Sequence, residues 1–222
     1  MSKTDQYTMQ DPRHQYSTGN TRKNESQPKP GLDTKLDPKA DHGEETYRGA
    51  ARLKRRKALI TSGDSGIGRA VALAFAREGA DVVINYLESE GADGEQTLSL
   101  LNQAGVNAKA IEGDIRNESF CRAMVDYAST KGAITTFTKG CAKMLIKRGI
   151  RINGVAPVPV WTPLQQSGEQ PEENLEEFGK HFPFGRPGQP AELAPVYVYL
   201  ASQESSYVTA EIMGVTGGEH LP

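Results

Sequence analysis

Two side chains in the middle of the chain have the types and the spacing of an acid/base pair. Tyr127 and Lys131 are four residues apart, and on a helix such positions share a face, so a phenol and an ammonium would point into one site. A phenol has a pKa of about 10 and is a poor base at neutral pH, but a neighbouring ammonium favours the phenolate. The pair therefore predicts proton transfer to or from a substrate oxygen. The same spacing is also typical of an ordinary surface pair.

A glycine-rich turn follows the first strongly apolar segment of the chain. Residues 58–60 are Ala-Leu-Ile, and the stretch 61–68, TSGDSGIG, leads into a helix-like pattern over 69–77. Such a turn collects backbone N–H groups at the positive end of a helix, where a phosphate anion binds. Gly66 and Gly68 would let the main chain approach a pyrophosphate and let the helix pack on the strand. A tight turn without a ligand is the alternative that the turn alone leaves open.

Together the two motifs resemble the short-chain dehydrogenase/reductase family, whose cofactor loop reads Thr-Gly-x-x-x-Gly-x-Gly and whose catalytic motif reads Tyr-x-x-x-Lys. The resemblance implies reversible hydride transfer between NAD(P) and an alcohol or carbonyl, with Tyr127 as acid/base. Lys131 would lower the pKa of Tyr127, and both residues would contact the cofactor. Ser62 replaces the family's first glycine, and a positive φ there would cost a serine roughly 1–3 kcal/mol, which weakens binding. The implied cofactor contacts in the loop are Thr61, Gly63, Asp64, Ser65, Gly66, Ile67 and Gly68.

The same resemblance assigns cofactor contacts to the ends of two further strands. Asp114 and Ile115 match the family's acidic position that helps to hold the adenine, although an aspartate there is also an ordinary helix N-cap. Tyr86 stands where NAD-selective relatives carry an acidic residue, and Ser65 stands where NADP-selective relatives often carry a basic one. Because neither the acidic nor the basic residue is present, the cofactor is predicted only as NAD(P).

A proline-rich segment resembles the family's Pro-Gly-x-x-x-Thr loop, which covers the nicotinamide. Pro157, Val160 and Thr162 are the cofactor contacts that this resemblance implies. Val158 replaces the expected glycine, and a β-branched residue tolerates unusual backbone angles poorly. Composition alone would favour a rigid loop without a ligand.

Short aliphatic runs alternate with amphipathic segments along the chain, which predicts an α/β fold with a Rossmann-like parallel sheet and helices on both faces. A helix through Tyr127 is expected to end at Gly149, and residues 173–182 are expected to form a lid over the cleft. The expected strands are 58–60, 81–86, 107–114, 150–157 and 207–218, and the other expected helices are 69–77, 92–104 and 191–201.

The centre of the family's pattern is missing. Only twelve residues separate Asp114 from Tyr127, where the family has its strands four and five, an Asn-Asn-Ala-Gly motif and the catalytic serine. About two βα units are lost at roughly 30 residues each, and we predict an internal deletion near 125–126. In the family's strand order 3-2-1-4-5-6-7, this leaves a 3-2-1 half and a 6-7 half. Either strand one pairs with strand six, or the halves stay loosely joined with exposed apolar edges.

Two functions therefore stay open. The chain is either an oxidoreductase of the family's type with impaired activity, or a non-catalytic remnant that binds a dinucleotide or another subunit. Ser129 does not replace the lost serine, because it lies about 200° around the helix from Tyr127.

Composition limits the organisation and the partners of the chain. Residues 1–40 contain no Val, Ile, Phe or Trp. We therefore predict that residues 1–50 form a disordered or surface-wrapping arm ahead of a domain over 51–222. The net charge of −2 does not suggest nucleic acid or a membrane surface as a partner. The two cysteines form neither a disulfide framework nor a metal site, and a cytoplasmic location is expected. No apolar run reaches the roughly 20 residues of a membrane helix.

The long arm and the C-terminal residues 202–207 and 219–222 narrow the resemblance. They resemble a subgroup that includes bacterial stress-associated oxidoreductases and plant glucose/ribitol dehydrogenase-like proteins. The resemblance implies a small alcohol, aldehyde, ketone or sugar alcohol as substrate, and a homo-tetramer or dimer.

Overall fold

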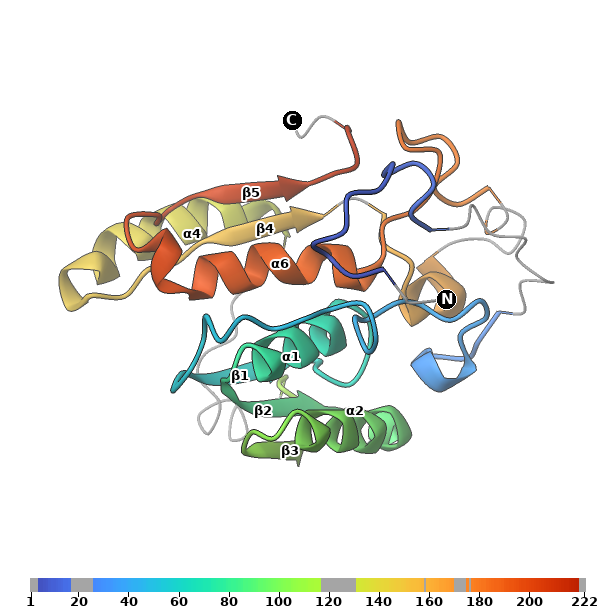
Figure 1. The fold of residues 1–222 in the computed structure, drawn as a ribbon, viewed down its shortest axis with the longest axis horizontal. Coiled ribbons are helices and arrows are strands. Elements are labelled where there is room, and N and C mark those ends of the chain that lie inside the picture. The colour runs from blue at the N-terminus through green and yellow to red at the C-terminus, as the bar shows by residue number, and fades with distance from the viewer. Residues whose placement is uncertain are drawn as a thin grey trace.

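The computed structural model describes residues 4–16, 26–116, 131–157, 159–169, 175 and 177–219 of the 222-residue chain. Its strands form two separate parallel sheets with helices packed along them (Figure 1). The predicted α/β class, with a parallel sheet flanked by helices, is confirmed. The predicted junction near 125–126, Tyr127, Ser129 and Val158 all fall outside the described residues.

The first sheet holds three parallel strands in the order β1-β2-β3. Its elements alternate along the chain as β1 (Lys57–Thr61), α1 (Gly66–Arg77), β2 (Asp81–Tyr86), α2 (Gly91–Gln103) and β3 (Ala108–Glu112). In the register of the sheet, Val82 of β2 lies between Ala58 and Ala108. Val82 and Ile84 of β2 are fully buried and Val83 is half-buried, because this strand has a neighbour on each side. The 3-2-1 half predicted from the sequence is therefore present.

The second sheet pairs β4 with β5 in parallel. The elements of this half are α4 (Lys131–Leu145), β4 (Gly154–Pro157), α6 (Pro190–Ala201) and β5 (Ile212–Val215). A 3-10 turn follows α4 and ends at Gly149, whose φ of 74° confirms the predicted C-cap. β4 is shorter than predicted, because the N–H of Ile152 donates to the Thr209 hydroxyl instead of to a strand ladder. Shorter helical turns cover Asp33–Lys35, Glu88–Glu90, Ile146–Arg148, Gln165–Glu169 and Gln203–Ser205.

Helices, rather than strands, join the two halves. In the described residues β1 pairs only with β2 and β4 only with β5, so strand one does not pair with strand six. Instead α1 packs against α6, and small side chains on α1 allow the two helices to approach closely. The shared core contains Ala70, Ala74 and Leu73 of α1 together with Ala194 and Val198 of α6.

The N-terminal arm lies against both halves of the domain (Figure 1). Leu36, Tyr47 and Leu53 are buried, although the segment as a whole is poor in apolar residues. Its main attachments are polar: the carboxylate of the fully buried Glu78 accepts hydrogen bonds from the Tyr47 hydroxyl at 2.6 Å and from the guanidinium of Arg52. A polar segment is thus ordered by hydrogen bonds instead of by a core of its own.

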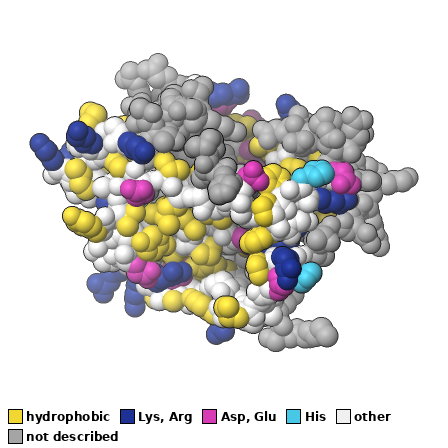
Figure 2. Space-filling model, turned by 90° about the horizontal axis from the view of Figure 1, so that it is seen from above, with side chains coloured by type: hydrophobic (Ala, Val, Ile, Leu, Met, Phe, Trp, Pro, Cys, Tyr) yellow, Lys and Arg dark blue, Asp and Glu magenta, His cyan; other side chains and the backbone are white. Residues whose placement is uncertain are grey.

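Several large hydrophobic side chains of the described residues remain exposed in both halves of the molecule. Leu59 of β1 is 47% exposed, and Met144, Ile146 and Ile150 near the end of α4 are also exposed. Figure 2 shows hydrophobic side chains gathered in the middle of the face that is uppermost in Figure 1, where β5 and α4 lie. None of the helices in the described part of the chain has the length and apolar character needed to cross a membrane.

Candidate functional site

The glycine-rich turn connects the carboxyl end of β1 to the start of α1. Ser62 has a φ of 48° and Gly66 a φ of 50°, both in the left-handed region. The positive φ expected at Ser62 is therefore confirmed, and a serine is strained there where glycine is not. A Cβ on Gly68 would fall on the carbonyl oxygen of Ser62. Only a glycine at 68 lets α1 start this close to the strand.

The first turn of α1 keeps its backbone N–H groups free of side-chain caps. Ser65 is the N-cap residue, in extended conformation, and its side chain makes no cap hydrogen bond. The first turn carries no acidic residue. Uncapped N–H groups and the positive end of the helix dipole together form a site suited to an anion.

Asp64 lies inside the turn, and its carboxyl does not cancel the positive potential of the helix N-terminus. Its side chain is buried, and neither carboxylate oxygen has a hydrogen-bond partner among the described residues. Burial, together with the negative charges of Glu90 and Asp93, raises the pKa of Asp64 to about 7. Below neutral pH the carboxyl is therefore mostly protonated and does not repel an anion at the turn.

Thr162 meets the glycine-rich turn from the other half of the molecule. A Cβ on Gly66 would lie 3.1 Å from the Cγ2 atom of Thr162. The segment is held by a bridge between Val160 and Gly188 and by the N–H of Trp161, which donates to the Gly188 carbonyl at 2.9 Å. The structure thus brings together two segments that were each predicted to contact a cofactor and that are about a hundred residues apart in the chain. Pro157 is exposed at the end of β4, and Val160 is buried.

The ends of β2 and β3 are tied together by a residue that the sequence analysis missed. Asn85 is buried, and its Nδ2 group donates to the carbonyls of Ile111 and Gly113 at 3.0 Å each. Its own carbonyl accepts the N–H of Gly63 at 3.1 Å. Asn85 therefore fixes the carboxyl ends of all three strands around the turn. The feature of the sequence that could have identified Asn85 is its position as a polar residue inside an aliphatic strand.

The side chains of Tyr86 and Asp114 have protein partners at this edge. A Cβ on Gly94 would lie 2.5 Å from the Tyr86 ring, and the Tyr86 hydroxyl is 3.5 Å from Glu112 Oε1. The carboxylate of Asp114 accepts hydrogen bonds from the backbone and the guanidinium of Arg116, which lowers its pKa. Ile115 follows in the same turn.

The predicted acid/base pair, Tyr127 and Lys131, lies at the boundary of the described residues. Lys131 is the first residue of α4, and its side chain and Tyr127 are outside the description. Their roles therefore stay predictions. In the described part of the chain, no group of three or more His, Cys, Asp or Glu residues is arranged to hold a metal ion.

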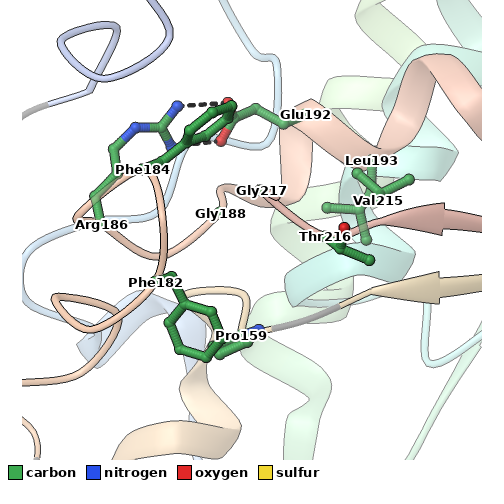
Figure 3. A pocket seen from close by; sticks show the side chains of 10 residues that line it. All are labelled: Pro159, Phe182, Phe184, Arg186, Gly188, Glu192, Leu193, Val215, Thr216 and Gly217. Atoms are coloured by element: carbon green, nitrogen blue, oxygen red, sulfur yellow. Dashed lines mark hydrogen bonds and ion pairs between the residues drawn. The ribbon is translucent and has the colours of Figure 1, made fainter. Parts of the chain in front are cut away.

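A small cavity of about 90 Å³ lies at the carboxyl ends of β4 and β5 (Figure 3). Its apolar lining includes Pro159, Phe182, Phe184, Leu193 and Val215. Arg186 and Glu192 stand beside it and form a bidentate ion pair, with both N–O distances at 2.8 Å. Because the two charges neutralise each other, the cavity favours an apolar group.

Comparisons with known proteins match the chain to oxidoreductases. A family model described as short chain dehydrogenase covers residues 56–126, and one described as enoyl-(acyl carrier protein) reductase covers residues 126–220. The Escherichia coli protein named uncharacterized oxidoreductase YghA is 40% identical over 291 aligned positions, which cover 96% of this chain and 99% of the relative. Glucose and ribitol dehydrogenase of Daucus carota is 33% identical, over 88% of this chain and 95% of its own length.

A solved structure resembles the fold as well. The 3-oxoacyl-[acyl-carrier protein] reductase of Brucella melitensis, crystallised with bound NAD, aligns with a TM-score of 0.64 and 27% identity, over 78% of this chain and 94% of that one. The alignment with the Escherichia coli relative spans 291 positions, whereas this chain has 222 residues. The relative therefore carries residues that have no counterpart here.

Proposed function

Because the chain belongs to the short-chain dehydrogenase/reductase family, we propose that it binds NAD(P) and catalyses hydride transfer to or from a small alcohol or carbonyl compound. The observation that supports this most is the meeting of the glycine-rich turn with Thr162, beside an uncapped helix N-terminus. A dinucleotide has an anionic diphosphate and a nicotinamide carboxamide, and these two segments offer N–H groups to the first and a hydroxyl to the second.

The residues present fit such a cofactor. A Cβ on Gly68 would collide with the Ser62 carbonyl, so a glycine at this position lets α1 begin directly against the turn, as the proposed diphosphate site requires. Residues 61–68 would hold the diphosphate, residues around Tyr86 and Asp114 the adenosine, and Pro157, Val160 and Thr162 the nicotinamide. When bound, NAD(P) supplies the hydride donor or acceptor.

Tyr127 would transfer the proton that accompanies the hydride. In the reducing direction its hydroxyl donates to the oxygen of the carbonyl, and in the oxidising direction its phenolate accepts the proton of the alcohol. Lys131 is one helical turn away and would stabilise the phenolate. The substrate is proposed as a small aldehyde, ketone, alcohol or sugar alcohol, and the dimer or tetramer expected from the resemblance stays a prediction.

We further propose that turnover by this chain is low. The two family models meet at residue 126, which supports a deletion near 125–126 in the interval that holds the family's catalytic serine. Losing one oriented donor to a developing oxyanion costs about 10²–10³ in rate, and misplacing the remaining groups by an ångström can cost roughly a further 10². A chain that binds the cofactor without turning over would be the remnant that the sequence left open.

Titration with NADH and NADPH, followed by their fluorescence, tests the binding half of the proposal. We expect saturable binding, which Gly68→Ala abolishes because its Cβ collides with the Ser62 carbonyl. Gly140→Ala is the matched control, because nothing lies within 4 Å of a Cβ at that helical position. The proposal fails if the unmodified chain binds neither dinucleotide, or if Gly68→Ala and Gly140→Ala bind alike.

A further inference from the structure

The N-terminal arm is anchored first on the helices that carry the glycine-rich turn. Asp93 at the start of α2 is fully buried, and its carboxylate accepts the backbone N–H groups of Asp33 at 2.5 Å and of Thr34 at 3.0 Å. Arg69 in the first turns of α1 lies 3.3 Å from the carboxylate of Asp33. Residues 33–34 are thus fixed relative to α1 and α2 by buried charge-assisted contacts.

The second anchor lies on the segment that follows β4. The indole Nε1–H of Trp161 donates to the Pro38 carbonyl at 2.8 Å, and Nε2 of Gln166 donates to the Asp37 carbonyl at 3.0 Å. Trp161 and Gln166 are both buried. The arm therefore satisfies polar groups that would otherwise be buried without partners, which makes this contact costly to lose.

Ahead of both anchors in the chain, the arm packs backbone to backbone against the segment that follows β4. A Cβ on Gly31 would lie 2.5 Å from the carbonyl oxygen of Pro163 and 2.9 Å from Cβ of Ser167. Gln27 also pairs with Gln166, through its backbone N–H at 2.9 Å and its side-chain amide at 2.8 Å. No side chain larger than hydrogen fits at position 31 without moving the arm.

These contacts converge on Thr162. Its two neighbours, Trp161 and Pro163, are both covered by the arm, and its own methyl group faces Gly66. Thr162 follows β4 and the glycine-rich turn follows β1, and these strands belong to two sheets that share no strand pairing in the described residues. The arm is attached to both sides of this contact, so it bridges the place where the two halves meet.

We propose that residues 27–38 of the arm are a positioning element of the dinucleotide site, because they hold the turn at Thr162 against the glycine-rich turn. The inference rests on the proposed function and adds to it: affinity for the dinucleotide depends on a segment that makes no contact with it. An arm that only stabilised the domain would change the melting temperature and leave the dissociation constant of the folded protein unchanged.

The chain provides its own reporter for a test. Trp161 is the only tryptophan, it is buried under the arm, and its emission shifts to the red when its indole is exposed to water. Gly31→Ala should displace the arm from Pro163, and Gly140→Ala is the control substitution in open space. We expect Gly31→Ala to red-shift the emission and to raise the dissociation constant for NADH at least threefold. Gly140→Ala should change neither.

A second variant, Trp161→Phe, removes the hydrogen bond to Pro38 and keeps an aromatic ring at position 161. Trp161→Phe keeps an aromatic ring near Phe178, whose centroid lies 6.0 Å away, but lacks the Nε1–H donor to Pro38. We expect a two- to tenfold loss of NADH affinity, equivalent to one hydrogen bond, in a protein that unfolds cooperatively.

The outcomes separate the two proposals. A red shift in Gly31→Ala with unchanged affinity would overturn the positioning role and leave the proposed function standing. If the unmodified chain binds no dinucleotide, the proposed function fails. Amide exchange at Trp161 and Gln165 then decides whether the arm holds the turn: faster exchange in Gly31→Ala supports it, and unchanged exchange contradicts it.

Discussion

β1 and β2 lie side by side in one sheet, are both rich in aliphatic residues, and are buried to very different extents. Val82 and Ile84 of β2 are fully buried, whereas Leu59 of β1 is 47% exposed. The strands differ in their neighbours: among the residues that the structure describes, β2 is hydrogen-bonded to a strand on each side, and β1 on only one. We infer from this difference that β1 has the sequence of an interior strand but occupies the position of an edge strand.

The two halves of the molecule also differ in how deeply their residues are buried. In the described residues, the half built on β1, β2 and β3 holds most of the buried core, together with buried ionisable groups such as Asp64 and Glu78. The half built on β4 and β5 has two short strands of which no residue is fully buried. The half to which we assign cofactor binding is thus present, and the deletion that we propose falls between it and the rest.

The largest expected effect comes from truncating matched side chains in the two neighbouring strands. Ile84→Ala should destabilise the protein by about 2–5 kcal/mol, because it leaves a cavity in the core. Leu59→Ala should cost less than about 1 kcal/mol, because the side chain is half exposed already. Denaturant unfolding of both variants measures the difference. Similar losses would mean that β1 is covered in solution.

The buried carboxyl of Asp64 should make stability depend on pH. Its pKa is raised in the folded state to about 7, so the folded protein binds the proton more tightly than the unfolded chain does. Stability is then greatest near pH 4, falls as the pH rises towards 7, and levels off above that value, with a total loss of up to about 4 kcal/mol. Asp64→Asn should remove this slope. An unchanged slope in thermal melts from pH 4 to 8 would contradict the assignment.

A histidine in the arm should loosen its attachment as the pH rises. His42 is buried with its ring nitrogens 3.3 Å from Asp33 and 3.4 Å from Glu44, and Arg69 contacts both carboxylates. Burial lowers the pKa of His42, but the adjacent carboxylates of Asp33 and Glu44 raise it more, so it lies above its usual value. The stabilisation is complete below about pH 6.5 and is lost as the pH rises through the raised pKa.

Limited proteolysis of the arm measures this effect. Cleavage within residues 26–50 should be severalfold faster at pH 8.5 than at pH 6, after correction for the protease's own pH dependence. In His42→Gln the difference should disappear. Equal cleavage of the unmodified chain at both pH values would show that His42 does not hold the arm.

The smallest expected effect is a gain of cofactor affinity. Ser62 has a positive φ in the glycine-rich turn, and Ser62→Gly relieves about 1 kcal/mol of strain. We expect NADH to bind up to roughly tenfold more tightly. Fluorescence titration of both proteins checks this, and equal or weaker binding by the variant would show that the serine is not strained.

The sequence predicted most of the first half and little of what joins the halves. Local patterns define β2 and the turn, and the replacement of glycine by Ser62 indicated the strained position before the backbone was known. The attachment of the arm had no such signal, because many of its partners are backbone carbonyls such as that of Pro38. The contact between Gly66 and Thr162 depends on tertiary packing, which no spacing in the sequence contains.

Restoring the missing interval tests the central claim, that this chain keeps a working cofactor half and has lost the centre of its active site. The measurement is the steady-state oxidation of NADH and NADPH with aldehydes, ketones and sugars. It compares the unmodified chain with a graft that carries the corresponding segment of the Escherichia coli relative between Val125 and Asp126, and with the Tyr127→Phe form of each. We predict that the graft is at least about a hundredfold faster than the unmodified chain and that Tyr127→Phe abolishes the gain. Robust turnover by the unmodified chain that is lost in its own Tyr127→Phe form would contradict the account.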